Sequence, residues 1–273
     1  MLFSYTIVGL LSHAPYKFRV QARNIYGYGA LSDEVTITTT DVPHIMDPVV
    51  TAQFGDDVKL TWTEPLTGGH PILDYTVKLF IPVTKEFVED PNCKFTDPSI
   101  KECTFTMNYL EDTYQFKYGE LIQAMAKARN IRGSNEYSSV NNEGAIALTR
   151  PAFMYPVTEG PLTVKETIHL LWETITLPYH LGGAPIINYV IDWDQGGYTW
   201  VELVTLPASP ISPNEHLVTG LVNNKTHKFK IRAQNKYGLG AWSEISFLRP
   251  TGVPEGISPI ETNLYGTNVY IEW

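Results

Sequence analysis

The chain has 273 residues, of which 43% are hydrophobic and 18% charged, and its formal net charge is -9 at pH 7. This length and balance predict about two to three globular domains, each with room for a core. The basic residues are scattered and form no positive stripe of the kind that nucleic acids bind, so we expect no nucleic-acid partner. No run of about 18 apolar residues is present, so we expect no membrane span in this sequence.

Residues 1–42 carry the pattern of a domain's last strands. Within them, residues 16–22 alternate between apolar and polar side chains, which is typical of a strand with one buried face. Asn24 then leads into Tyr-Gly-Tyr-Gly, where glycines favour a reversal of the chain. Strands are also expected near residues 4–8 and at residues 34–39. The apolar start of the chain could be mistaken for a signal peptide, but it lacks the basic residues with which a signal peptide begins, so we favour a strand there. Three strands leave a sheet face uncovered, so we expect the sequence to begin inside a larger protein.

Residues 43–150 are predicted to form a complete unit. Val58, Leu60 and Trp62 alternate along an early strand, and a Gly-Gly turn then leads to a strand that bears Tyr75. The next elements are expected to be a cysteine-containing hairpin at 87–105 and strands at 120–129 and 145–148. The composition of residues 121–128 also suits a helix, but this segment aligns with the repeated strand, which we favour.

The two cysteines, Cys93 and Cys103, lie ten positions apart in the predicted hairpin. A bridge that closes so short a loop would stabilise the fold by somewhat less than the roughly 3 kcal/mol expected for a loop of about 15 residues. The alternative is a pair of buried free thiols in a cytosolic protein. Neither cysteine has a histidine at ligand spacing, so we expect no metal ion there.

Residues 151–252 repeat the same order, with an early strand that carries Trp172, a Gly-Gly turn and a strand that carries Tyr189. Residues 227–233 then repeat the alternating strand, and residues 253–273 begin the order again. The late asparagines stand at 24, 130 and 235, in steps of 106 and 105, and the early tryptophans stand at 62, 172 and 273, in steps of 110 and 101. Such a period is that of a whole domain, because solenoid repeats are shorter.

The early-strand tryptophan, the mid-strand tyrosine and the late Tyr-x-Phe-x-Val-x-Ala-x-Asn-x-Tyr-Gly-x-Gly resemble the fibronectin type III domain, and the resemblance covers the whole chain. It implies an all-β fold of tandem immunoglobulin-like antiparallel β-sandwiches. The expected domains are the C-terminal part of one domain (1–42), a complete divergent domain with the cysteine hairpin (43–150), a second complete domain (151–252) and the N-terminal strands of a further one (253–273). The implied structural core residues are Trp62, Trp172, Trp273, Tyr75, Tyr189 and Tyr16.

Tyr16 falls at the tyrosine corner of this family, where a phenol hydrogen-bonds to nearby backbone. Ile122 and His227 replace it in the two complete units, so the phenolic bond does not carry over to them. A buried isoleucine can still pack at this place, but a backbone acceptor then needs another donor or water.

Residues 43–150 also resemble a divergent form found in large surface and ciliary repeat proteins of ciliated protists. The resemblance rests on the two cysteines, on Tyr-Gly-Glu before the late strand and on Asn-Glu-Gly-Ala after it. It implies a disulfide between Cys93 and Cys103 and a cell-surface or ciliary setting.

Two sets of polar residues are candidate sites. Asn224-Lys-Thr is an Asn-x-Ser/Thr sequon in a predicted loop, so Asn224 is a candidate for an N-glycan if the chain is secreted. Asp192 and Asp194 share a strand face, but no alternating oxygen ligands surround them, so solvated strand-end residues are favoured over a Ca²⁺ or acid-base pair. The histidines form no catalytic pattern and no phosphate loop is present, so we expect no enzyme activity, cofactor or metal ion.

These features predict a non-catalytic structural or interaction protein, a rod-like array whose partners are other proteins or copies of itself. Short Pro-containing linkers restrict the angles between neighbouring sandwiches. The alternatives are an accessory binding module of a larger enzyme and an intracellular ciliary or cytoskeletal scaffold. We expect residues 43–252 alone to be monomeric, elongated in solution scattering and rich in strand by circular dichroism.

Overall fold

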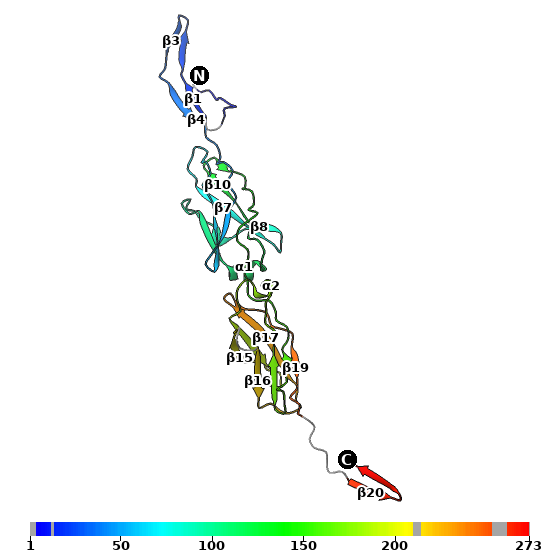
Figure 1. The fold of residues 1–273 in the computed structure, drawn as a ribbon. Coiled ribbons are helices and arrows are strands. Elements are labelled where there is room, and N and C mark those ends of the chain that lie inside the picture. Colours follow the sequence, from blue (N-terminus) through cyan, green and yellow to red (C-terminus); the bar gives the residue numbers. More distant parts are fainter. Residues whose placement is uncertain (1–3, 12–13, 210–213, 253–260, 273) are drawn as a thin grey trace. The chain divides into compact units, whose positions relative to one another are not determined.

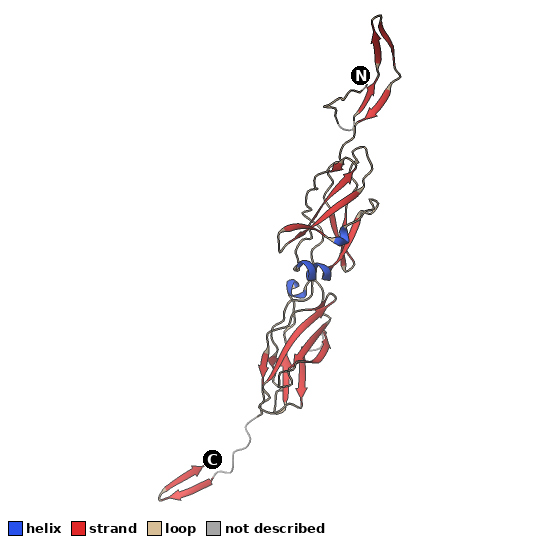
Figure 2. Ribbon diagram, turned by 180° about the vertical axis from the view of Figure 1, so that it is seen from behind, coloured by secondary structure: helices blue, strands red, loops and turns tan. Residues whose placement is uncertain are grey.

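The computed structural model describes residues 4–11, 14–209, 214–252 and 261–272, and the chain folds as two compact units, Met1–Thr149 and Arg150–Trp273 (Figure 1). Both units are built from antiparallel strands with a few short helices (Figure 2). Trp273, one of the expected core tryptophans, lies outside the described residues.

The first unit opens with two small sheets. β1 (Pro15–Phe18) pairs with β4 (Val35–Thr38), and β2 (Gln21–Asn24) pairs with β3 (Gly27–Leu31). Every residue of β2, β3 and β4 is exposed. The strand expected at residues 4–8 is wrong, because this segment pairs with no strand in the described part of the chain.

The remainder of the first unit is a β-sandwich. One sheet has the order β5–β6–β9, formed by Val50–Phe54, Asp57–Thr61 and Glu102–Thr106. The other has the order β11–β10–β7–β8, formed by Gly133–Ser134, Ala124–Asn130, Asp74–Ile81 and Glu86–Glu89. Every second residue of β7 and of β10 is buried, so one face of this sheet covers the core. The segment for which composition also allowed a helix is therefore a strand.

Two short helices lie between the strands of this sandwich. η1 (Pro91–Cys93) follows β8, and α1 (Met107–Tyr114) follows β9 directly. The hydroxyl of Thr106 caps α1 by accepting the N–H of Tyr109 at 3.1 Å, and Gln115 ends the helix in the left-handed region at φ 57°. The sequence predicted no element over α1.

The second unit is also a β-sandwich. One sheet has the order β12–β13–β16, formed by Thr158–Glu159, Thr167–Leu171 and Glu215–Thr219. The other has the order β15–β14–β17–β18, formed by Val201–Pro207, Asn188–Trp193, His227–Asn235 and Gly238–Leu239, and β19 (Ser246–Leu248) also pairs with β17. A single turn of helix, α2 (Pro178–Leu181), precedes the Gly-Gly turn, and β20 (Glu261–Tyr265) forms a hairpin with β21 (Asn268–Glu272).

Both sheets of the second sandwich contribute to its core. Ile168 and Leu170 of β13 lie in one apolar cluster with Ile191 of β14 and with Phe229 and Ile231 of β17. All five side chains are fully removed from solvent. Burial on this scale supplies the main stabilisation of such a domain.

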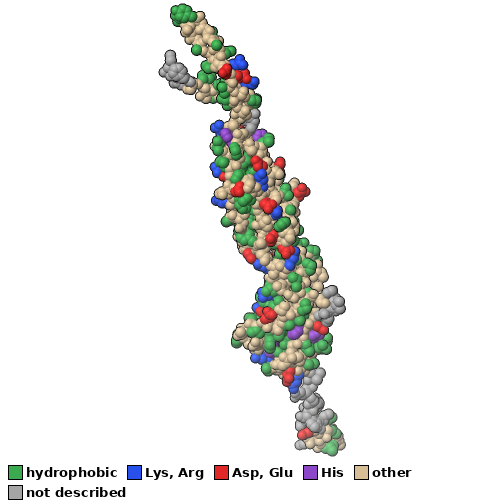
Figure 3. Space-filling model, turned by 90° about the vertical axis from the view of Figure 1, so that its left-hand side faces the viewer, with side chains coloured by type: hydrophobic (Ala, Val, Ile, Leu, Met, Phe, Trp, Pro, Cys, Tyr) green, Lys and Arg blue, Asp and Glu red, His purple; other side chains and the backbone are tan. Residues whose placement is uncertain are grey.

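The two sandwiches have the same strand order, since β5–β6–β9 matches β12–β13–β16 and β11–β10–β7–β8 matches β18–β17–β14–β15. They differ at the outer strand. β15 pairs with β14 from Asn188 to Trp193, whereas β8 pairs with β7 only at residues 78–81. Acidic and basic side chains are interspersed on the face of the molecule that Figure 3 draws.

Candidate functional site

The tryptophans and tyrosines that define the sequence repeat form equivalent pairs. Trp62 and Tyr75 lie with ring centroids 5.9 Å apart and planes at 60°, and both are buried. Trp172 and Tyr189 lie 5.7 Å apart with planes at 62°, and they are buried too. Edge-to-face contact of this kind is favourable between aromatic rings. Burial raises the pKa of Tyr75 to about 12, and it raises the pKa of Tyr189 as well.

The tyrosine corner is present in the N-terminal segment. The backbone N–H of Leu11 donates to the hydroxyl of Tyr16 at 2.8 Å. Tyr16 is only half-buried, in contrast to the expected core position, because the sheets around it have two strands each. Ile122 is fully buried at the same repeat position of the first sandwich.

His227 takes the corner position of the second sandwich. It is 2% exposed, and the indole N–H of Trp193 donates to its Nδ1 at 3.2 Å. The neutral ring therefore carries its proton on Nε2. Burial lowers the pKa of His227, because a charged imidazolium would lose its hydration there.

The late asparagines close the turns that follow the repeated strand. The side-chain oxygen of Asn130 accepts the N–H of Arg132 at 2.7 Å, and that of Asn235 accepts the N–H of Tyr237 at 2.8 Å. Asn24 makes the same bond to the second residue after it, at 2.8 Å. An Asx turn of this kind holds the chain reversal in place.

The same asparagines also reach the Gly-Gly turn on the neighbouring side of the sandwich. The side-chain amide of Asn130 donates to the carbonyl of Thr67 at 2.8 Å, and that of Asn235 donates to the carbonyl of Leu181 at 2.9 Å. Thr67 and Leu181 are the residues that directly precede the two glycines in each unit. One side chain therefore joins the two repeated turns in both sandwiches, and both asparagines are 1% exposed.

The linker before the first sandwich is bonded to these turns. The amide of Asn130 also donates to the carbonyl of Asp41 at 2.8 Å, and Asp41 N–H donates to the carbonyl of Gly68 at 2.8 Å. The guanidinium of Arg132 donates to the hydroxyl of Thr40 at 2.9 Å. A Cβ on Gly68 would collide with the Asp41 carbonyl, so the close approach requires glycine. In the second unit, Ala152 N–H donates to the carbonyl of His180 at 2.9 Å in a similar way.

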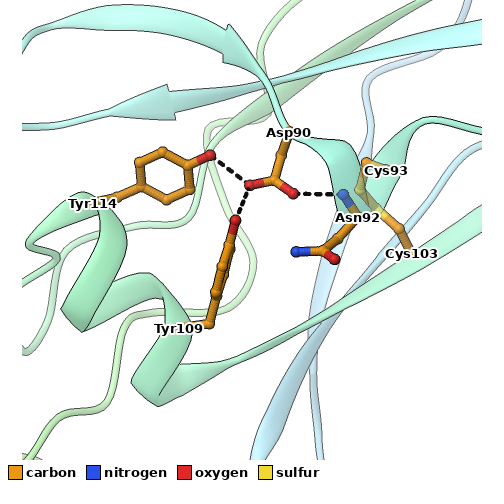
Figure 4. Close-up of a disulfide and its surroundings, with 6 residues drawn as sticks. All are labelled: Asp90, Asn92, Cys93, Cys103, Tyr109 and Tyr114. Carbon is orange, nitrogen blue, oxygen red and sulfur yellow. Dashed lines mark hydrogen bonds between the residues drawn. A yellow bond between two sulfur atoms is a disulfide. The ribbon is translucent and has the colours of Figure 1, made fainter.

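The structure contains a disulfide between Cys93 and Cys103, so neither cysteine is free. Their Cα atoms are 5.4 Å apart, within the range usual for disulfides, and both residues are 4% exposed. The bond ties η1 to β9, which belongs to the opposite sheet from β8 (Figure 4).

A buried carboxylate lies beside the disulfide. Asp90 is 2% exposed and accepts three hydrogen bonds, from the N–H of Asn92 at 2.7 Å, the hydroxyl of Tyr109 at 2.7 Å and the hydroxyl of Tyr114 at 2.5 Å (Figure 4). The bond to Asp90 raises the pKa of Tyr109, and burial followed by the bond to Asp90 raises that of Tyr114. The carboxylate thereby fastens α1 to the segment that carries η1.

The paired aspartates of the second sandwich bond to groups of the protein itself. Asp194 is 2% exposed rather than solvated, and its carboxylate accepts the N–H groups of Gly196 and Lys228, each at 2.9 Å. Asp192 forms an ion pair with Lys230 at 3.3 Å. The expectation of solvated strand-end residues is thus wrong for Asp194, whose side chain holds the turn after β14.

Cations and aromatic rings alternate on the outer face of β17. Lys230 lies 4.5 Å from the ring centroid of Trp200 and 4.3 Å from that of Trp242, and Arg232 lies 4.0 Å from that of Trp242. Lys228 lies 5.5 Å from the ring of Tyr198. These distances are those of cation–π contacts, although Tyr198 itself is 96% exposed.

Asn224 lies in an exposed turn at φ 62°. Its side-chain oxygen accepts from Arg249 at 3.3 Å, and the hydroxyl of Thr226 accepts from the same guanidinium at 3.1 Å. The side-chain nitrogen, to which a glycan would be joined, makes none of these bonds.

No group of three or more His, Cys, Asp or Glu residues with a geometry for metal binding occurs in the described ranges. None of the helices in those ranges is long and apolar enough to cross a membrane.

The matched strand orders, the buried Trp–Tyr pairs and the asparagine-closed turns define an all-β protein of tandem immunoglobulin-like antiparallel β-sandwiches of the fibronectin type III kind. No family model matches the chain. The chain is 27% identical over 250 residues to "M-protein, striated muscle" of Gallus gallus, a match that covers 89% of this chain and 16% of that protein. It is 25% identical over 243 residues to "Fibronectin type III domain-containing protein 1" of Margaritifera margaritifera, with 88% of this chain and 29% of that protein covered.

Among solved structures, the chain is similar to the crystal structure of chicken CNTN1 FN1-FN3 domains, with a TM-score of 0.38, 14% identity and coverage of 84% of this chain and 75% of that chain. The chain spans less than a third of the length of the two curated relatives. Those relatives are fibronectin type III-containing proteins, and this similarity supports a structural or interaction role. The resemblance to ciliate proteins stays a prediction.

Proposed function

We propose that the chain is a non-catalytic segment of a longer structural protein, in which fibronectin type III domains act as spacers and as docking surfaces for other proteins. The domain boundaries that we propose are residues 1–42, 43–150, 151–252 and 253–273. The observation that carries this proposal is that the side chains that define the repeat serve packing and turn closure. These side chains are Trp62, Tyr75 and Asn130 and their counterparts in the second sandwich.

The bonded linker supports the spacer role. Thr40 and Asp41 are tied to the turns of the sandwich that follows them, through Arg132, Asn130 and Gly68. A linker that is hydrogen-bonded along its length has fewer conformations than a free one. We infer that bending is concentrated just before these residues.

We propose that the protein acts at the cell surface, and more specifically at a cilium. The buried Cys93–Cys103 disulfide favours an oxidising compartment, because disulfides are rare in the cytosol. In this setting Asn224 carries an N-glycan. An intact-mass measurement on native material should show added hexose at this sequon, and an unmodified mass would refute the glycan.

A second candidate function is an intracellular scaffold of the muscle type, which the similarity to a striated-muscle M-protein favours. Mass spectrometry of native material under non-reducing conditions separates the two settings. A linked Cys93–Cys103 peptide supports the exterior, whereas two free thiols support the scaffold.

Solution scattering tests the spacer function itself. The segment of residues 43–252 should be monomeric and elongated, with strand-rich circular dichroism. A compact particle, in which the two sandwiches collapse onto each other, would contradict a spacer.

A further inference from the structure

The two sandwiches differ at one sheet edge. In the second, β15 lies beside all of β14, with Tyr189 opposite Leu206, Val190 opposite Thr205 and Ile191 opposite Val204. In the first, β8 accompanies β7 only at residues 78–81. The outer edge of residues 74–77, which correspond to residues 188–191 through the match of Tyr75 with Tyr189, therefore has no strand beside it in the described part of the chain.

This edge is held open by the residues that follow β8. Asp90, directly after the last residue of β8, is fixed by Tyr109 and Tyr114, and Cys93 is bonded to Cys103 of the opposite sheet (Figure 4). Extending β8 along β7 would require breaking the disulfide and removing the buried carboxylate from its donors. Such a removal is costly, because the three donors would lose their acceptor.

A cavity of about 230 Å³ lies beside the open edge. It is lined on one side by residues 74–77 of β7 and on the other by Glu89, Asp90 and residues 93–96. The hydroxyl of Tyr75, one of the lining residues, is buried and has no hydrogen-bond partner among the described residues. The volume is below the roughly 300–1,000 Å³ of small-molecule sites, so the cavity by itself is not a site for a compact ligand of that kind.

We propose that this open edge of β7 binds an extended segment of a partner protein, which adds to the sheet as a strand. The inference rests on the proposed function as a docking array and names the place where docking occurs. Strand addition uses the unpaired backbone N–H and C=O groups of an edge, and alternate side chains supply specificity. The second sandwich shows the kind of segment that fits, since Val204, Thr205 and Leu206 of β15 occupy the equivalent edge.

The charges at the edge offer one carboxylate with which a basic residue of the bound segment can pair. Asp74 is paired with Arg129, and Asp90 is occupied by its three donors, whereas Glu89 and Lys94 are exposed at the rim. A lysine or arginine opposite Glu89 would therefore meet an accessible carboxylate.

The test uses the full chain and a labelled synthetic peptide with the Val-Thr-Leu core of β15 flanked by lysines, with binding followed by fluorescence anisotropy. The matched peptide control carries N-methyl groups on alternate amides, which keeps the side chains but removes the backbone donors. We expect the unmodified peptide to bind and the methylated one to bind at least about tenfold more weakly, since loss of two buried hydrogen bonds has this effect. Equal binding of both peptides, or binding of neither, would overturn the proposal.

Hydrogen exchange locates the binding. Without peptide, the outward-facing amides of residues 74–77 should exchange at least about tenfold faster than those of residues 188–191, and the peptide should slow only the former. Amides that are already protected in the free chain would refute the open edge. If that protection grew with protein concentration, the occupant would be a second copy, which also contradicts the proposal.

A pair of charge variants completes the test. Glu89→Lys should weaken peptide binding about two- to fivefold, the range expected of an exposed ion pair. Glu86→Lys, at the opposite end of β8, is the matched control and should leave binding unchanged. Equal effects of the two variants would show non-specific charge attraction and would refute the site. Solution scattering of residues 43–252 is independent of these results, so failure of strand addition is distinguishable from failure of the spacer function.

Discussion

At the residue scale, one asparagine joins the two turns that recur in each sandwich. Asn235 accepts the N–H of Tyr237 and donates to the carbonyl of Leu181, and it is 1% exposed. An amide suits this place because it supplies an acceptor and two donors on one short side chain. This double role gives a physical reason why an asparagine recurs at the same place in both sandwiches, at Asn130 and at Asn235.

Asn235→Ala should lower the free energy of unfolding of the second sandwich by about 1–3 kcal/mol, because two buried backbone groups lose their partner. Urea denaturation followed by tryptophan fluorescence measures the change. Asn263→Ala, at an exposed position of β20, is the control and should have little effect. Equal stability of Asn235→Ala and the parent would contradict the role of this side chain.

His227 makes the second sandwich sensitive to acid. Its folded-state pKa is lowered by burial, so the unfolded chain takes up a proton more readily and stability falls as the pH drops below about 6.5. Protonation at Nδ1 would also break the bond from Trp193. The histidine contributes stability that is complete above its ordinary pKa and is lost on acidification.

His227→Asn keeps an acceptor near the Trp193 indole and removes the titrating group. We expect its stability to depend less on pH between about 7 and 5, by at most about 1.4 kcal/mol per pH unit. Denaturation midpoints measured across this range for parent and variant give the two slopes. Identical slopes would show that protonation of His227 is not linked to unfolding.

At the element scale, the disulfide and Asp90 organise the connection between β8 and α1. Replacing both cysteines with alanine should destabilise the first sandwich by less than about 3 kcal/mol, because the closed loop is short. Thermal unfolding followed by calorimetry measures this loss, and the second sandwich is an internal control whose transition should not move. A shift of both transitions together would indicate that the sandwiches unfold as one unit.

The strand pattern could be predicted from the sequence because β6, β7 and β17 each alternate inward and outward residues. α1 could not, since its inward residues Met107 and Leu110 are only two in number and an eight-residue helix shows too little of a 3.6-residue period. Asp90 lies 19 residues before Tyr109 and 24 before Tyr114, so their contact depends on tertiary structure. The open edge of β7 likewise appears only when strand registers are compared.

At the scale of the whole molecule, two sandwiches with one strand order differ in what they leave exposed. The second covers its sheet edge with β15, and cations from β17 contact its Trp200 and Trp242 rings. The first leaves half of β7 open beside a cavity. A tandem array can in this way use a common fold for spacing while a local change in one member provides a place for a partner.

Stretching single molecules of the chain between two handles tests most directly the claim that it is an array of independent sandwiches. We predict two unfolding events, each releasing about 350 Å of chain, since each sandwich has roughly 100 residues that extend by about 3.5 Å apiece. Under non-reducing conditions one event should be shorter by about 35 Å, the length that the Cys93–Cys103 bond keeps closed. A single event for the whole chain, or two events unaffected by reduction, would contradict the account.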